Sequence, residues 1–292
     1  MANRRVLVKR RRATQNIRKI TRTMQLIATA RFQAAFKRAV GSRPYTEKLT
    51  ELADRLASAA TDVDHPLMRT PEAAEPELLV VLTSNRGLCG GFNANVLRKA
   101  GEHLKELEAQ GRESELIVIG KKGNAYLQFH GYSVTEAITD ISDLPRYDEV
   151  EPLASRLMDR FGRGEIGSVR VAYMKFISTS RQRPVVDQVL PLHTEVGESE
   201  PRENTSEVEY EYSPEPQQLL AELLPATVKI HFYQCFSDAS VSEQVARMVA
   251  MKAATDAAED MIKRLTQQYN RARQTAITME LLDIVGGASA LE

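Results

Sequence analysis

The sequence predicts an α/β protein in which two long helices, one at each end of the chain, form an antiparallel coiled coil joined to an α/β domain. Two observations predict this class. Apolar residues recur three and four positions apart at both ends of the chain, where glycine and proline are rare, and short β-rich runs alternate with helical stretches between them. With 292 residues, the chain is long enough to bury a core of its own.

The first segment, residues 1–60, is predicted to be a coiled-coil helix with one bend, at Gly41 to Pro44. Its first apolar stripe has the alternating spacing of a coiled-coil seam and consists of Ala13, Ile17, Ile20, Met24 and Ile27. A second stripe, Leu49, Leu52 and Leu56, follows the bend.

The second segment, residues 75–193, is predicted to be a Rossmann-like α/β domain with a mostly parallel sheet, because its strands and helices alternate. The expected strands are Leu78 to Thr83, Leu116 to Ile119, Tyr132 to Ile138, Val169 to Phe176 and Val185 to Leu190. The expected helices are Asn93 to Ala109, Lys122 to His130 and Asp148 to Phe161. Residues 194–215 follow as an exposed acidic loop, in which glutamates are frequent and Arg202 is the one basic residue.

The last segment, residues 216–292, is predicted to be the second coiled-coil helix, with a kink where Pro225 interrupts it. Its seam alternates by three and four over more than four heptads: Met248, Met251, Thr255, Ala258, Ile262, Leu265, Tyr269, Ala272, Ala276 and Met279. Such a seam needs a partner, and the N-terminal stripe is the nearest candidate.

Charge is distributed unevenly, although the chain as a whole is neutral. Residues 1–40 contain twelve Lys and Arg and no Asp or Glu. This basic arm predicts an acidic partner surface on nucleic acid, anionic lipid or protein, unless it is only a solvated helix face. Apolar runs of a few residues predict no membrane span, and two cysteines predict no disulfide framework.

Motifs for cofactors, metals or catalysis are weak. Gly162, Gly164 and Gly167 have the G-x-G-x-x-G spacing of a dinucleotide-binding loop. They follow a predicted helix instead of a strand, however, so a helix-to-strand turn explains them better. The run Gly120 to Gly123 lacks the spacing of a phosphate-binding loop. The five histidines look scattered and Cys235 shows no histidine partner, so we expect no catalytic, cofactor or metal site.

Longer strings resemble the gamma subunit of F-type ATP synthase from end to end. ATQNIRKITRTMQLIATAR (Ala13 to Arg31) is similar to that family's opening helix, and TSNRGLCGGFNANV (Thr83 to Val96) to its first strand-to-helix turn. The strongest similarity is in SEQVARMVAMKAATDAAEDMI (Ser242 to Ile262) and YNRARQTAITMELLDIVGGASAL (Tyr269 to Leu291).

The resemblance implies a non-catalytic subunit that serves as the central rotating shaft and binds no cofactor of its own. Its implied partners are a ring of three alpha and three beta subunits around the coiled coil, with the epsilon subunit and the c-subunit ring at the α/β foot. The basic arm would then meet an acidic surface of the beta subunits. The implied location is peripheral, on the cytoplasmic face of a bacterial plasma membrane.

Individual positions carry over from the same motifs. Those implied to couple the shaft to its ring are Met24, Arg247, Gln274, Thr278 and Glu280. Tyr210, Glu211 and Tyr212 lie outside these motifs, in the region before the C-terminal helix that the resemblance implies to touch the c ring. The chain departs from the family pattern at Asn85, where the family more often has Asp, and beside Met24 at Gln25 to Ile27 and at Arg31.

Three functions therefore compete at this point. They are a mechanical stalk, a nucleotide-dependent enzyme with helical arms, and a nucleic-acid-binding coiled coil. Saturable binding of ATP or NAD by the purified chain would favour the second, and strongly salt-dependent DNA binding the third.

Overall fold

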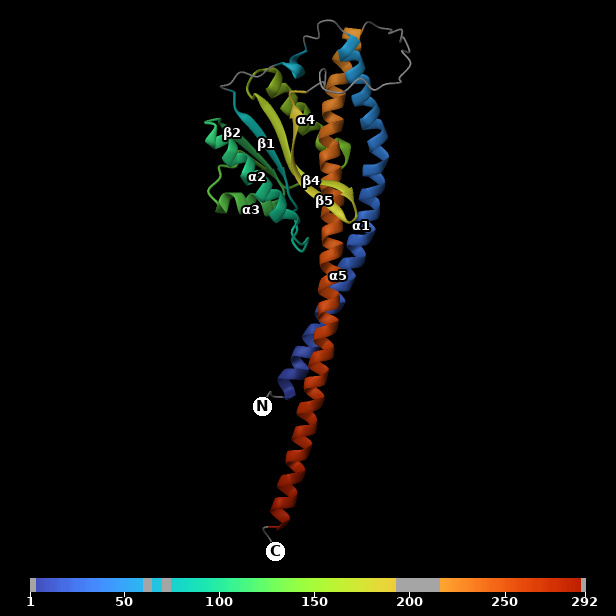
Figure 1. The fold of residues 1–292 in the computed structure, drawn as a ribbon, viewed down its shortest axis with the longest axis vertical. Coiled ribbons are helices and arrows are strands. Elements are labelled where there is room, and N and C mark those ends of the chain that lie inside the picture. The colour runs from blue at the N-terminus through green and yellow to red at the C-terminus, as the bar shows by residue number, and fades with distance from the viewer. Residues whose placement is uncertain (1–3, 60–64, 70–74, 193–215, 290–292) are drawn as a thin grey trace, which may run out of the picture. The chain divides into compact units, whose positions relative to one another are not determined.

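A computed structural model describes residues 4–59, 65–69, 75–192 and 216–289 and confirms the predicted fold class. Two long terminal helices flank a region in which strands and helices alternate (Figure 1). The elements are α1 (Arg4–Ala59), the short 3-10 helix η1 (Pro66–Met68), β1 (Glu77–Leu82), α2 (Phe92–Ala109), β2 (Ser114–Ile119), α3 (Lys121–Phe129), β3 (Glu136–Ile138), α4 (Tyr147–Gly162), β4 (Ser168–Ser178), β5 (Arg181–Leu190) and α5 (Pro216–Ser289).

The two terminal helices are longer and less interrupted than their breaker residues suggest. Pro44 lies inside α1 and Pro225 inside α5, and each helix continues on both sides of its proline. The predicted acidic loop, 194–215, lies outside the described residues. None of the described helices is both long and apolar enough to cross a membrane.

The chain forms two compact units. The helical unit consists of Met1–Ala30 and Arg247–Glu292, and the α/β unit of Arg31–Ala246. Because α1 and α5 contribute to both units, the division into 1–60, 75–193, 194–215 and 216–292 stays a sequence prediction.

The α/β unit is built on a five-stranded sheet with strand order β3-β2-β1-β4-β5. The neighbours β3 and β2, β2 and β1, and β1 and β4 run parallel, as in a Rossmann-like sheet, whereas β5 returns antiparallel to β4. Glu77 at the start of β1 is in register with Ser114 of β2 and Ser168 of β4. The prediction of a mostly parallel sheet is therefore confirmed.

Helices cover both faces of this sheet (Figure 1). One face packs on α2 and α3, through residues that include Leu79 and Val81 of β1. The other packs on α4 and the first part of α5, through Leu78, Val80 and Leu82. All six residues of β1 are buried, as expected for a central strand covered on both sides.

Candidate functional site

The helical unit contains an antiparallel helix pair whose register is set by four contacts. The Arg11 guanidinium lies 5.4 Å from the centre of the Tyr269 ring, Thr14 Oγ1 is 3.7 Å from Met261 Sδ, and Arg18 Nη1 is 3.1 Å from Glu259 Oε1. Thr255 Oγ1 donates to Thr21 Oγ1 at 2.8 Å in the buried seam. As residue numbers rise along α1 they fall along α5, which confirms the predicted antiparallel coiled coil.

The predicted seam of α5 is largely confirmed. Met251, Thr255, Ala258 and Leu265 are buried, and the other predicted positions are half-buried as far as Ala276. Met279 is 46% exposed, so the seam ends before it.

The predicted seam of α1 is wrong. Residues seven apart are buried instead: Leu7, Thr14, Thr21 and Ala28. Of the predicted positions, Ile17, Ile20 and Ile27 are at least half exposed, Ala13 is exposed, and Met24 is half-buried. Thr14, Thr21 and Ala28 are small, and small side chains at a helix contact let the two helices approach closely.

This outward face of α1 is an apolar surface that the described chain does not cover. Its large apolar residues are each between 45% and 60% exposed: Val6, Ile17, Ile20 and Ile27. Leu26 is also 57% exposed, but it lies about 100° further round the helix. Basic residues such as Arg4, Lys19 and Arg22 are exposed on the same helix. Apolar contact together with positive charge suits a partner protein that presents acidic groups.

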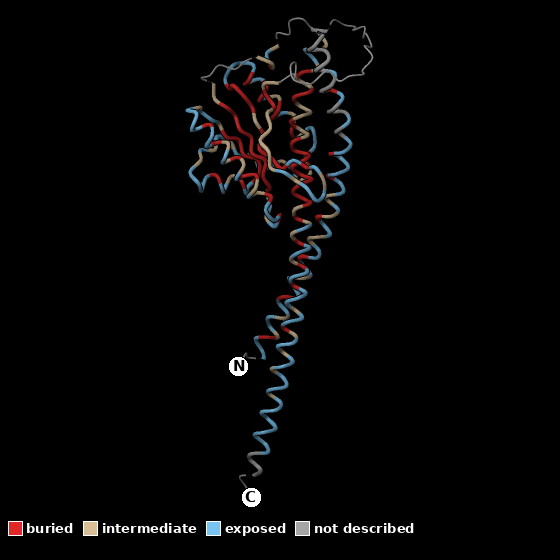
Figure 2. The backbone as a smooth tube through the Cα atoms, in the orientation of Figure 1, coloured by how far each residue is buried: buried red, intermediate tan, exposed pale blue. Residues whose placement is uncertain are grey.

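The end of α5 is a second uncovered surface. Continuing the register of the pair places Arg4, where α1 begins, opposite about residue 272, so α5 extends further as a single helix. The terminal apolar segment, residues 277–285, carries six large apolar side chains that are 46% to 72% exposed: Ile277, Met279, Leu281, Leu282, Ile284 and Val285. Exposed residues dominate this end of the helix in Figure 2. Glu280 and Asp283 are the charged residues of this segment, and the rest of its surface is mostly apolar. A large exposed apolar surface is typical of a site of contact with another chain.

The residues carried over from the family motifs fall into two groups. Gln274, Thr278 and Glu280 are exposed on the single-helix end of α5, where Thr278 Oγ1 donates to the Gln274 carbonyl oxygen at 3.0 Å. Met24 is half-buried on α1, and Arg247 is only 7% exposed on α5. By the helix register Met24 lies opposite about residue 252, roughly 33 Å along α5 from Gln274. Tyr210, Glu211 and Tyr212 lie outside the described residues.

The carboxyl ends of β1, β2 and β3, where α/β proteins often bind nucleotides, border a polar hollow of about 570 Å³. Arg31, Arg86 and Asp143 line it, and both arginines form ion pairs with the carboxylate of Asp143. Asn85 also lines it and joins its loops: its side-chain nitrogen donates to the Thr139 carbonyl oxygen at 3.2 Å, and its side-chain oxygen accepts from the Lys121 amide at 3.2 Å.

Close packing explains the glycines beside this hollow. Gly120 has φ 96°, and a Cβ atom there would lie 2.3 Å from the Thr83 carbonyl oxygen. A Cβ atom at Gly123 would lie 2.5 Å from Thr83 Oγ1, which accepts the Gly123 amide hydrogen bond at 3.0 Å. These glycines let α3 start against the end of β1, which is a structural role. Gly162 and Gly164 likewise belong to the turn from α4 to β4.

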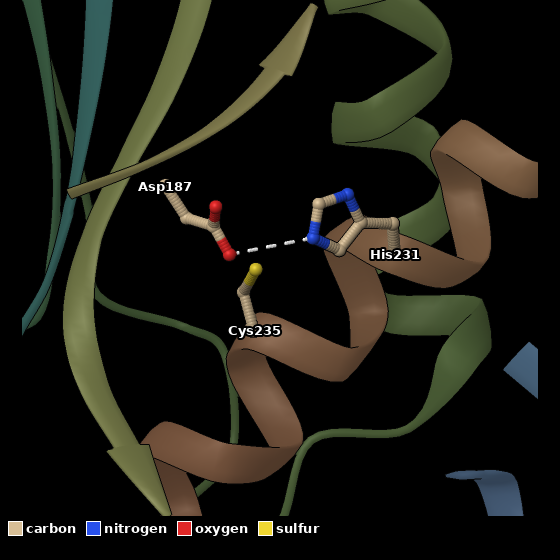
Figure 3. A group of neighbouring side chains, drawn as sticks. All are labelled: Asp187, His231 and Cys235. Atoms are coloured by element: carbon tan, nitrogen blue, oxygen red, sulfur yellow. Dashed lines mark ion pairs between the residues drawn. The ribbon is translucent and has the colours of Figure 1, made fainter. Parts of the chain in front are cut away.

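The view that Cys235 lacks a histidine partner is wrong. Figure 3 shows that His231 and Cys235, one turn apart on α5, point toward Asp187 of β5. His231 Nε2 lies 3.5 Å from Asp187 Oδ2. His231 lowers the pKa of Asp187 although burial acts in the opposite direction, and burial strongly raises the pKa of the Cys235 thiol. The four-residue spacing of His231 and Cys235 was visible in the sequence, whereas the long-range approach of Asp187 was not.

A helix pair with uncovered apolar surfaces, attached to an α/β unit whose core is closed on both faces, defines a stalk protein that acts by contact with other chains. A family model described as ATP synthase matches residues 3–291. The chain belongs to the family of ATP synthase gamma chains, which are non-catalytic subunits of the central stalk.

Individual relatives are similar over the full length. The ATP synthase gamma chain of Rhodopirellula baltica is 45% identical over 295 residues and covers 100% of both chains. That of Paraburkholderia phymatum is 39% identical over 285 residues and covers 96% of each.

Solved structures share the fold. A chain of the Euglena gracilis mitochondrial ATP synthase, from a structure of its OSCP, F1 and c-ring parts, is similar with a TM-score of 0.67 at 17% identity, covering 99% of this chain and 94% of that one. A second chain, from the rotor of the same enzyme, gives a TM-score of 0.64 at 18% identity and covers 94% and 98%.

Proposed function

We propose that the chain turns inside a collar of three alpha and three beta subunits and links ion flow through the membrane to ATP synthesis or hydrolysis in that collar. The observation that carries the proposal is the terminal apolar segment of α5, whose six large apolar side chains are uncovered by the described chain. Enclosure by a ring of other subunits would remove that surface from water without fixing it through many ion pairs.

The partners at the α/β end are proposed to be the epsilon subunit and the ring of c subunits. The similar Euglena chain comes from a structure that contains a c-ring, which supports this assignment. As a subunit of ATP synthase, the chain associates with the membrane peripherally. We propose the cytoplasmic face of a bacterial plasma membrane, because relatives of high similarity come from bacteria such as Rhodopirellula baltica.

Native mass spectrometry of the gently solubilised complex tests this function. With a tag on this chain, we expect one copy together with three alpha and three beta subunits. A free chain or a homo-oligomer, under conditions in which the host's ATP synthase stays intact, would overturn the proposal.

Within this function we propose that Met24, Arg247, Gln274, Thr278 and Glu280 lie at the coupling contacts between shaft and collar. The exposure of Gln274, Thr278 and Glu280 beyond the helix pair supports a contact with other chains. Met24 is half-buried beside the outward apolar face of α1, and Arg247 is mostly covered within the chain. For Tyr210, Glu211 and Tyr212, contact with the c ring stays a prediction from their place before the C-terminal helix.

Replacing Met24 with lysine should impair coupling more than assembly. A new cation close to acidic collar residues adds an attraction of up to about 4 kcal/mol at 4 Å in a partly screened environment, and that attraction changes as the shaft turns. We expect ATP-driven proton pumping by membrane vesicles to fall several-fold relative to ATP hydrolysis. Thr23→Lys, which adds the same charge at the exposed neighbouring position, is the matched control. Normal pumping by the Met24→Lys complex would contradict the assignment.

A further inference from the structure

We propose that Asp187, His231 and Cys235 form a binding site for one divalent transition-metal ion, of which Zn²⁺ is the best match, and that this ion fastens α5 to β5. This inference is independent of the rotary function and concerns the α/β unit alone. The three side chains offer a carboxylate oxygen, an imidazole nitrogen and a sulfur atom, all within 4.8 Å of one another. Zn²⁺ binds these three ligand types in proteins.

The spacing of the donor atoms suits one shared ion. Bonds of about 2.0–2.3 Å in a tetrahedral arrangement place the donor atoms about 3.3–3.8 Å apart. His231 Nε2 and Asp187 Oδ2 are 3.5 Å apart, which is long for a direct hydrogen bond and right for two ligands of one ion. Cys235 Sγ points toward the same place in Figure 3 and lies within 4.8 Å of both atoms.

The backbone around the cluster is well placed to hold ligands. His231 and Cys235 lie on consecutive turns of one helix, so both side chains face the same way without a loop having to order. Asp187 comes from β5, which is paired along its length with β4. A site built on a helix and a strand has little conformational entropy to lose when the ion binds.

Neighbouring groups support the ligands. The hydroxyl of Tyr173, on β4, donates to Asp187 Oδ2 at 3.3 Å and orients the carboxylate, as outer hydrogen-bond partners do in metal sites. Burial raises the pKa of Tyr173 far above its usual value, so this hydroxyl keeps its proton. The charged groups Lys175 and Asp238 also act on the cluster. With a thiolate at Cys235, the site is negative overall and a divalent cation balances it.

An ion can reach the three side chains from solvent, and they leave room for a fourth ligand. The side chains of His231 and Asp187 are 32% and 35% exposed, whereas Cys235 is buried. An ion can therefore enter from solvent and displace the thiol proton of Cys235, which leaves to water. Three protein ligands leave a fourth position for a water molecule.

Titration of the purified full-length chain with Co²⁺ tests the site, because cobalt reports its own ligands. We expect a near-ultraviolet sulfur-to-cobalt charge-transfer band and intense visible bands of four-coordinate cobalt, saturating at one ion per chain and reversed by Zn²⁺. Cys235→Ser should abolish the charge-transfer band. His231→Ala and Asp187→Asn should each weaken binding by at least about tenfold, because even the loss of an outer partner commonly has that effect.

Matched controls separate the site from adventitious binding and from misfolding. Cys89→Ser removes the other buried cysteine and His130→Ala an exposed histidine, and both should bind like the original chain. Zn²⁺ should raise the melting temperature of the original chain and of both controls, but not that of Cys235→Ser, whose folding is checked by circular dichroism without metal. A spectrum of six-coordinate cobalt without sulfur bands, or equal binding by Cys235→Ser, would overturn the proposal.

Discussion

At the scale of single residues, the buried carboxylate of Glu77 shows how the α/β unit tolerates charge in its sheet. Its side chain is 1% exposed at the start of the central strand β1. Burial alone would raise its pKa, but the hydrogen bond from His103, the charge of Arg170 and the hydroxyl of Ser168 together lower it. Arg112 adds a further ion pair at 3.5 Å. One anion thus holds together four side chains from three other parts of the chain, namely α2, the loop before β2, and β4.

Glu77→Gln should destabilise the protein by about 3 kcal/mol, because it leaves the partly buried Arg170 and Arg112 without their counter-charge. Thermal unfolding measured by circular dichroism checks this, with Glu102→Gln on the exposed face of α2 as the matched control. The control should change stability by less than about 0.5 kcal/mol. Equal melting temperatures for the two variants would show that the network contributes nothing.

The pH dependence follows from the direction of the same shift. Because the pKa of Glu77 is lower in the folded chain, its contribution is fully present above its ordinary value of 4.5 and is lost as pH falls through the folded-state pKa. The stability difference between the original chain and Glu77→Gln should therefore shrink in acid below pH 4.5. A difference that stayed constant throughout that range would refute this account.

At the scale of the elements, the sequence predicted the strands and the helices of the α/β unit to within four residues, because their patterns arise from burial inside the same chain. The seam predicted for α1 was wrong because its apolar pattern does not arise from burial inside the same chain. Ile17 and Ile20 form the more apolar stripe, yet they face outward, while Thr14 and Thr21 pack against α5. An apolar stripe on a helix indicates that the stripe becomes buried, but the sequence does not say whether its own chain or a partner chain buries it.

The candidate sites, too, depend on contacts between distant parts of the chain, which local sequence patterns do not show. The single-helix end of α5 lies in a family motif that the sequence shows. That this end is exposed could not be predicted, because it depends on which residue of α5 lies opposite the start of α1. For the Asp187 cluster, the helical spacing of His231 and Cys235 was readable. The antiparallel return of β5, which brings Asp187 to them, depends on the whole sheet.

Paired substitutions test the observed seam. Ala28 is fully buried and Ala30 is exposed, and both lie on α1. Ala28→Leu should destabilise the chain by about 1–3 kcal/mol through overpacking against α5. Ala30→Leu should change stability by less than about 0.5 kcal/mol. Urea unfolding followed by helical circular dichroism measures both, and the opposite order would favour the seam predicted from the sequence.

At the scale of the whole molecule, the two units differ in how completely they cover their apolar surface. The α/β unit buries both faces of its sheet with helices of its own. The helical unit leaves large apolar side chains exposed on the outward face of α1 and on the end of α5. The first unit has a closed core of its own, although single apolar side chains such as Phe129 are exposed, whereas the second leaves connected apolar surfaces for other chains to cover.

Deleting residues 277–292 should therefore separate folding from assembly. We expect an unchanged melting temperature for the isolated chain, because the large side chains described in this segment are exposed. The assembled complex should dissociate at a lower temperature, because the apolar surface that its partners cover is gone. Calorimetry of both samples checks this. A destabilised isolated chain would show that the segment packs against its own chain.

The change from a helix pair to a single helix along α5 also affects how the shaft stores elastic energy. Where α1 and α5 lie together, the Thr21 to Thr255 hydrogen bond and the Arg18 to Glu259 ion pair oppose sliding of one helix past the other, so twist must deform both. Beyond about residue 272, α5 is the only described helix that resists the twist. A given torque therefore winds this thinner end through a larger angle, and the end acts as a torsion spring in series with a stiffer bar.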